Sequence, residues 1–327
     1  MKYRYNFYDI LSLESNIDLS DIVLPLEAVK DESDKKGEYD LTVRLIDFKK
    51  KSIKEYQQIG LGLYYSKEKN SIVSVVNICG LACYWEISNL SGNQTVLQFN
   101  HNYFFLFKHV FLFPLSSIYQ FNILIKMIMQ LKLLSKNYTF LIGGVAALSD
   151  KGVVFTGVPG TGKTTTTLNF LNYFSNAKYI SDDAFILGNG KLHSFPSPIR
   201  IRKFNSNLRF FKKFIDPRQR YKERLQSVFR GTYDIYFLEK SNTQYIKKIS
   251  TDEGINKICS INNRVFPYFS ERILASFSYI DSGVSFMNMQ KKQIDILKEN
   301  LNNSNFYILC SCNAANYDTL LESQYKT

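Results

Sequence analysis

Short runs in which apolar and polar residues alternate dominate the first hundred residues of the chain. Alternation with a period of two is typical of β-strands that bury one face. The runs that predict strands are 41–47, 59–65, 71–76 and 94–99, and turn residues separate them. We therefore expect a β-rich N-terminal region over residues 1–102, in which 1–36 read as irregular or mixed structure.

Residues 103–134 are strongly apolar, which favours either a membrane span or a buried core element. A span needs about 20 uninterrupted apolar residues. This run is interrupted by Lys108 with His109, by Pro114, and by Lys126 with Lys132. The pattern therefore fits a short buried element followed by a core helix over 116–134 better than it fits a membrane span.

The middle of the chain alternates between buried strands and helices. Residues 140–148 and 153–156 predict two strands that a tight turn joins as a hairpin. A helix from Lys163 to about Phe174 follows, and then a strand within 177–187 that ends in two adjacent carboxylates. Later elements are expected at 233–238 (strand), 291–299 (helix) and 305–310 (strand). This order predicts an α/β fold.

The stretch between the strand at 153–156 and the helix matches the phosphate-binding pattern G-x-x-x-x-G-K-S/T at every fixed position. Glycines let successive N–H groups turn inward around an anion, and the helix N-terminus adds partial positive charge. Lys163 is expected to reach the β- and γ-phosphates, and Thr164 to bind Mg²⁺. The residues expected to bind ATP are Gly157, Val158, Pro159, Gly160, Thr161, Gly162, Lys163, Thr164 and Thr165. The alternative is a glycine-rich turn that binds nothing.

Asp182 and Asp183 are the two adjacent carboxylates. The chain from Thr164 to Asp182 is just long enough for a short helix, a tight turn and one strand. A parallel β-α-β unit would bring both acids to the carboxyl end of that strand, beside the phosphate loop. One carboxylate there can hold Mg²⁺, and the other can accept a proton from a hydroxyl. The alternative is a solvated acidic turn.

Composition fits a soluble globular protein of one or two domains, since 45% of the 327 residues are hydrophobic and 21% are charged. The net charge of +12 is concentrated between Arg200 and Arg230. Such a block attracts an acidic peptide, a phosphorylated substrate or nucleic acid, or it is a solvated face. Within it, Arg200 and Arg202 would share one face of a strand. They could clamp a phosphate or a substrate carboxylate there. The alternative is that they are ordinary surface arginines.

The cysteines point to a reducing compartment. There are five of them, an odd number, and no cleavable signal is visible in the first residues, so we expect a cytoplasmic protein with free thiols. A zinc site built from Cys79, Cys83, Cys310 and Cys312 is the alternative. The apolar surroundings of Cys79 and Cys83 favour buried thiols instead.

Gly157–Thr164, followed closely by Ile180-Ser181-Asp182-Asp183 and a Pro-x-Pro stretch, resembles the HPr kinase/phosphorylase family, whose compact order phosphoenolpyruvate carboxykinases share. The resemblance covers roughly residues 138–240 and includes a later strand at 235–239. It implies a P-loop kinase core, ATP at the loop, and Asp182 as the favoured base. Relatives of this family include kinases that modify precursor peptides in natural-product clusters.

Two departures from the family limit what carries over. HPr kinases have a histidine on the strand before the loop, where this chain has Gly143-Gly144, and their Pro-Gly-Arg-Asn signature is missing here. Phosphorolysis and HPr recognition are therefore not expected. We expect residues 103–327 to form an ATP- and Mg²⁺-dependent kinase domain that acts on a hydroxyl, most simply a serine of a peptide or protein that is acidic. A small-molecule kinase and a nucleotide-dependent ATPase or switch stay open, as does homo-oligomerisation. No nucleic acid partner is expected.

Overall fold

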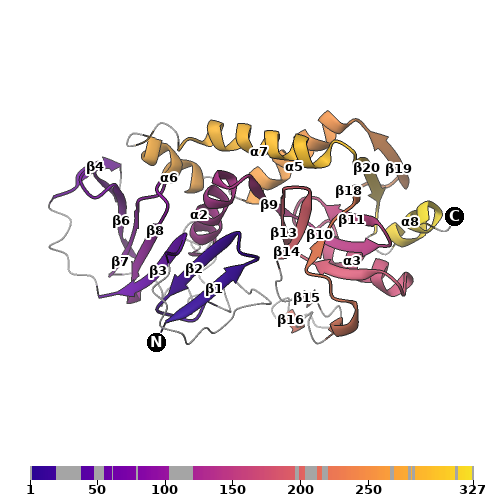
Figure 1. The fold of residues 1–327 in the computed structure, drawn as a ribbon, viewed down its shortest axis with the longest axis horizontal. Coiled ribbons are helices and arrows are strands. Elements are labelled where there is room, and N and C mark those ends of the chain that lie inside the picture. Colours follow the sequence, from indigo (N-terminus) through magenta and orange to yellow (C-terminus); the bar gives the residue numbers. More distant parts are fainter. Residues whose placement is uncertain are drawn as a thin grey trace. The chain divides into compact units, whose positions relative to one another are not determined.

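The computed structural model describes residues 2–19, 38–47, 55–60, 62–78, 80–102, 121–195, 199–202, 212–215, 220–265, 269–278, 281, 284–313 and 316–325. They form two compact units (Figure 1). Unit 1 contains the described residues up to Lys136 and those of Phe266–Lys291, and unit 2 contains those of Asn137–Val265 and from Lys292 onward. The domain division expected between residues 102 and 103 stays a prediction.

Unit 1 is built on one eight-stranded sheet in the order β1-β2-β3-β8-β7-β6-β5-β4. Its strands are β1 (Tyr3–Phe7), β2 (Leu11–Ser15), β3 (Leu41–Ile46), β4 (Gln57–Gly60), β5 (Leu63–Ser66), β6 (Ser71–Ile78), β7 (Leu81–Ser88) and β8 (Thr95–Asn100). The prediction of one strand over 59–65 is wrong, because the chain turns back at Gly62 and β4 pairs with β5 as an antiparallel hairpin. Residues 1–36, expected to be irregular or mixed, include the hairpin of β1 and β2.

Among the described residues, two helices lie wholly within unit 1. Helix α2 (Phe121–Ser135) corresponds to the predicted core helix and contacts β2, and α6 (Phe269–Ser278) contacts both α2 and β6. Residues 103–120, where the short buried element was predicted, lie outside the described part of the chain. Among the described helices, none is both long and apolar enough to cross a membrane.

Unit 2 contains a six-stranded sheet in the order β12-β10-β11-β18-β20-β19. Its strands are β10 (Gly144–Leu148), β11 (Lys151–Thr156), β12 (Lys178–Ser181), β18 (Thr232–Lys240), β19 (Tyr245–Ile249) and β20 (Asn305–Ser311). β11, β18 and β20 are parallel neighbours, whereas β10 is antiparallel to both β11 and β12. β12 therefore runs in the same direction as β11, and both strands end at the same edge of the sheet.

A second sheet of unit 2 has the order β17-β14-β13-β9, and a separate ribbon pairs β15 with β16. The strands are β9 (Tyr138–Ile142), β13 (Ala184–Gly188), β14 (Lys191–Phe195), β15 (Ile199–Arg202), β16 (Lys212–Ile215) and β17 (Val228–Phe229). The prediction of a single strand over 140–148 is wrong, because the chain breaks at Gly143. β9 pairs with β13 before the break, and β10 pairs with β11 and β12 after it.

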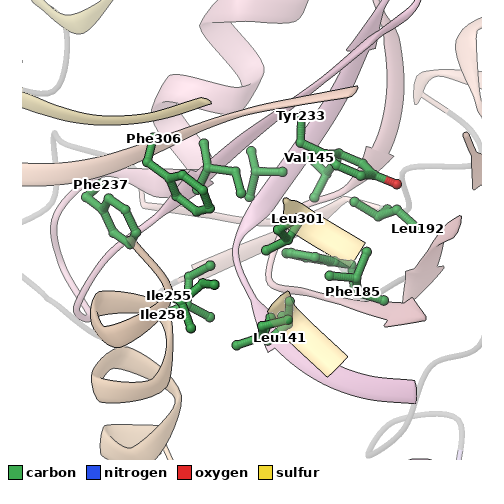
Figure 2. Close-up of a cluster of buried hydrophobic side chains, with 14 of the residues drawn as sticks. Leu141, Val145, Phe185, Leu192, Tyr233, Phe237, Ile255, Ile258, Leu301 and Phe306 are labelled. Atoms are coloured by element: carbon green, nitrogen blue, oxygen red, sulfur yellow. The ribbon is translucent and has the colours of Figure 1, made fainter. Parts of the chain in front are cut away.

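Helices cover both faces of the six-stranded sheet, which explains why its strands are apolar at consecutive positions. The described helices of unit 2 are α3 (Lys163–Tyr173), α5 (Thr251–Val265), the part of α7 (Phe286–Leu301) from Lys292 onward, α8 (Tyr317–Tyr325) and a short 3-10 turn, η3 (Lys222–Arg224). Ala146, Phe155 and Tyr236 pack in the core on the side of α3 and α8. Figure 2 shows the other core, in which Ile255 and Ile258 of α5 point toward side chains from both sheets. The described chain is thus a mixed α/β fold with several sheets.

Candidate functional site

The glycine-rich loop (Gly157–Gly162) connects the end of β11 to the start of α3. Its glycines have positive φ angles: 155° at Gly157, 88° at Gly160 and 100° at Gly162. Side chains rarely tolerate such angles, so the glycine pattern serves the path of the backbone. At Gly157 space is also limiting, because an added Cβ would lie 2.9 Å from the carbonyl oxygen of Leu238.

The start of α3 is an open helix N-terminus. Gly162 occupies the N-cap position in a left-handed conformation, and no side chain caps the helix there. The first N–H groups of a helix have no acceptor within the helix; the first that donates back to the turn is the Thr166 N–H, to the Gly162 carbonyl at 2.9 Å. Together with the helix dipole, the preceding N–H groups favour an anion at this point.

Lys163 lies at this helix start with its side chain half-buried and folded over the loop. Its Nζ donates to the carbonyl oxygens of Gly157 at 2.9 Å and Val158 at 3.2 Å. Burial lowers the pKa of Lys163, and the nearby carboxylates of Asp183 and Asp182 oppose that shift. The ammonium group is therefore held by neutral carbonyls at the mouth of the loop.

Asp182 and Thr164 meet at the sheet edge where β11 and β12 both end. Thr164 Oγ1 donates to Asp182 Oδ2 at 3.2 Å. The sequence predicts both residues as site residues, and the structure brings them together. Only 3% of the Asp182 surface is exposed, so this carboxylate is enclosed at the end of its strand.

Asp183 is exposed, in contrast to its neighbour. Its carbonyl oxygen accepts from the Gly143 N–H at 3.1 Å, which ties the acidic turn to the break between β9 and β10. The sequence pairs Asp183 with Thr164 as metal ligands, but Asp182 is the acid that contacts Thr164 in the structure.

The remaining threonines at the start of α3 differ in environment. Thr165 is exposed, whereas Thr166 and Thr167 are buried and donate to the carbonyls of Gly162 and Lys163 in the same helix. Thr167 also packs on β10: a Cβ added to Gly144 would lie 2.0 Å from Thr167 Oγ1. The glycine that stands near the family's histidine position thus lets α3 approach the sheet closely.

Tyr221 is a neighbour of Asp182 that sequence analysis missed. Its ring stacks on that of Tyr179, with centroids 5.1 Å apart and an interplanar angle of 8°. Burial raises the pKa of Tyr221; Arg220 and Arg224 oppose this, and the charge of Asp182 adds to it. No pattern around residue 221 in the sequence indicates that it comes near the acidic pair.

A pocket of about 610 Å³ opens on the side of the loop toward β18. Residues 157–161 form one wall, and the end of β18 and one side of α5 form the others. Glu239 and Lys257 face each other in it, with Lys257 Nζ 2.9 Å from Glu239 Oε1. Sequence analysis missed Lys257, since a lone lysine on a polar helix carries no signal.

The basic residues between Arg200 and Arg230 differ in what they contact. Arg224 is structural: its guanidinium donates to the carbonyls of Ala177 at 2.7 Å, Leu171 at 2.6 Å and Phe174 at 2.9 Å, at the end of α3. Arg200 and Arg202 lie on β15, but their side chains are outside the described part of the chain. Their predicted role in binding the substrate therefore stays a prediction.

The cysteines give no metal centre in the part of the chain that the structure describes. Within those residues, no group of three or more His, Cys, Asp or Glu side chains is arranged to hold a metal ion. Cys83, Cys259 and Cys310 are buried free thiols, and Cys312 is exposed. Cys79 lies outside the described residues.

Comparisons with known proteins add little to this geometry. No protein-family profile matches the chain, and no curated protein matches it in sequence. Among solved structures, it is similar to the HPr(Ser) kinase/phosphatase from Coxiella burnetii, with 9% sequence identity and a TM-score of 0.28 over 57% of this chain and 90% of that chain. A likeness this low carries no argument about activity, so the site must be interpreted from its own residues.

Proposed function

We propose that this chain is an ATP-dependent kinase that transfers the γ-phosphoryl group to a hydroxyl, in the first place a serine of a peptide or protein. The hydrogen bond between Thr164 Oγ1 and Asp182 Oδ2 (3.2 Å) carries the proposal. It joins a hydroxyl at an anion-attracting helix N-terminus to an enclosed carboxylate. The two groups suit phosphoryl transfer, because its catalysis is mainly positioning and electrostatic stabilisation.

Lys163 would neutralise charge on the phosphate oxygens. Its Nζ now donates to two loop carbonyls, and a phosphate oxygen in their place would give charge-assisted hydrogen bonds that are about twice as strong. Because burial lowers the pKa of Lys163, an adjacent phosphate would also favour its charged form. The loop N–H groups and α3 would hold the remaining phosphate oxygens.

The donor set beside the loop fits Mg²⁺. Thr164 and Asp182 offer only oxygen atoms, and Asp183 adds a carboxylate next to them. Mg²⁺ prefers oxygen ligands and is commonly bound by one or two protein groups together with phosphates and waters. In that position Mg²⁺ would act as a Lewis acid that neutralises charge on the transferred phosphoryl group.

Asp182 is our candidate for the base that accepts the proton of the acceptor hydroxyl, while Asp183 would share the metal or orient the attack. The contact of Asp182 with Thr164 would equally suit a metal ligand. The two roles differ in their dependence on the magnesium concentration: loss of a metal ligand can be offset by more Mg²⁺, whereas loss of the base cannot. The basic residues from Arg200 to Arg230 would attract an acidic or extended acceptor.

The test is transfer of labelled γ-phosphate from ATP to serine-containing acidic peptides, read by mass spectrometry. Lys163→Met should lower transfer by about a hundredfold or more. Lys178→Met, at an exposed position of β12, is the matched control and should behave like wild type. Equal transfer by the Lys163 variant would contradict the proposal. Label found only in free phosphate would favour the ATPase or switch, and label on a small hydroxyl compound would favour the small-molecule kinase.

A further inference from the structure

The pocket beside the glycine-rich loop exists because β18 is longer than its neighbour β11. The pairing of β11 with β18 ends at Thr156 and Phe237, where β11 gives way to the loop. The pairing of β18 with β20 continues to Lys240 and Ser311. The last three residues of β18 therefore lie alongside the loop instead of a strand, and all three line the pocket.

The pocket and the acidic pair lie on opposite sides of the phosphate loop. In the sheet order β12-β10-β11-β18, the loop follows β11, Asp182 follows β12, and the pocket lies at β18. Neither Thr164 nor Asp182 is among the residues that line the pocket. If transfer takes place at Asp182, a molecule bound along the loop would have its reacting end toward β12 and its other end toward β18.

The walls of the pocket combine apolar surface with one charged pair. Val158, Phe237 and Ile261 contribute apolar groups. Glu239 supplies acceptor oxygens, and Lys257 supplies donors 2.9 Å from them, with its Nζ 5.9 Å from the centroid of the Phe237 ring. These groups suit a nucleobase. The apolar side chains can contact its flat faces, and the adjacent donors and acceptors of Lys257 and Glu239 can bind its polar edge.

We propose that this pocket holds the nucleoside, base and ribose together, of the triphosphate whose phosphates bind the glycine-rich loop. The inference rests on the proposed function, because it assumes that the loop binds a nucleoside triphosphate. Loop residues 157–161 themselves form a wall of the pocket, so the phosphate and nucleoside sites are continuous. Its volume of about 610 Å³ lies within the range of small-molecule sites, about 300–1,000 Å³.

The acceptor hydroxyl would approach from the other side. Transfer is proposed at Thr164 and Asp182, which the pocket does not include. A serine bound among Glu239, Lys257 and Ser260 would have the whole loop between it and the acidic pair. The pocket thus suits the nucleoside and leaves the β12 side open to the acceptor.

Ser260 and Ser323 offer a matched pair of substitutions. Both serines are exposed on helices of unit 2 and donate to a carbonyl of their own helix, at 2.9 Å to Asn256 and at 2.8 Å to Leu320. Ser260 lines the pocket and Ser323 does not. Ser260→Trp fills the nucleoside site, and Ser323→Trp controls for the added surface tryptophan.

Calorimetric titration with magnesium ATP and with magnesium tripolyphosphate tests the assignment. Ser260→Trp should lose more than about tenfold in ATP affinity and keep wild-type affinity for tripolyphosphate, which also shows that the variant is folded. Ser323→Trp should match wild type for both ligands. Unchanged ATP affinity in Ser260→Trp, or an equal loss of both ligands, would overturn the nucleoside site while leaving the proposed kinase in place. A wild-type chain that binds neither ligand would overturn both.

Discussion

The side chain of Thr164 donates a hydrogen bond to the carboxylate of Asp182 at 3.2 Å, although 18 residues separate them in the sequence. Helix α3 carries the chain away from the end of β11, and β12 returns it in the same direction two positions along the sheet. The acid therefore arrives at the edge where the loop begins. This relationship makes the glycine-rich loop our candidate site of phosphoryl transfer.

Arg224 should stabilise the turn that leads from α3 into β12. Its guanidinium donates to three backbone carbonyls, those of Leu171, Phe174 and Ala177. Hydrogen bonds to a charged group contribute more than neutral ones, so Arg224→Ala should lower the free energy of unfolding by about 2–3 kcal/mol in urea titrations. Lys222→Ala, at an exposed position of the same segment, should change it by less than about 0.5 kcal/mol. Equal effects of the two substitutions would show that the carbonyl contacts contribute nothing.

Gly144 should be required for the close approach of α3 to β10. A methyl group there would lie 2.0 Å from Thr167 Oγ1. Overpacking of this kind costs about 1–3 kcal/mol, so Gly144→Ala should lower the free energy of unfolding by that amount. Thr167→Ala removes the opposing hydroxyl, and in its background the cost of Gly144→Ala should be smaller. A cost that is the same in both backgrounds would rule out the predicted clash.

His193 should make unit 2 less stable in mild acid. Burial, and then the charges of Lys191 and Arg230, lower its pKa from the ordinary value of 6.5 to about 4. As the pH falls from about 6.5 to about 4, the unfolded chain binds a proton that the folded chain does not, so stability is lost over that window. At pH 5 the loss is about 2 kcal/mol. His193→Phe should lose correspondingly less stability between pH 7 and pH 5 in urea titrations, and an unchanged pH dependence would exclude His193 as its source.

Asp183 should affect the magnesium requirement more than the transfer step, if it shares the metal as proposed. The side chain is exposed beside Asp182. Asp183→Asn should raise the Mg²⁺ concentration for half-maximal activity by about tenfold or more and approach wild-type rates at high Mg²⁺. If Asp182→Asn shows this behaviour instead, the metal role belongs to the acid that contacts Thr164.

The sequence predicts the loop and the acids well because their signals are local. The spacing of Gly157, Gly162 and Lys163 follows from the backbone turn and the helix start, and Asp182 follows directly after an apolar strand. The chain length between Thr164 and Asp182 predicts that the acidic pair lies beside the loop, but it does not predict which of the two acids contacts Thr164. Strand boundaries at these positions are set by residues close in the sequence.

Other features depend on residues far apart, and the sequence does not predict them. Gly143-Gly144 permits a break within 140–148, but both halves are apolar, so no local signal indicates that they belong to two different sheets. The pocket arises from a difference in length between β11 and β18, and the pairing of Glu239 with Lys257 joins a strand to the helix beyond the next strand. The role of Arg224 is likewise hidden, since in the sequence it is one cation among many.

We propose that Asp182 takes part in the transfer step itself. The most direct measurement compares wild type with Asp182→Asn in two assays: binding of magnesium ATP by calorimetry, and transfer of labelled γ-phosphate to a serine-containing peptide. We expect the variant to bind ATP within about threefold of wild type while transfer falls by at least about a thousandfold, as the loss of a catalytic base requires. Full transfer activity in Asp182→Asn would rule out this role of Asp182.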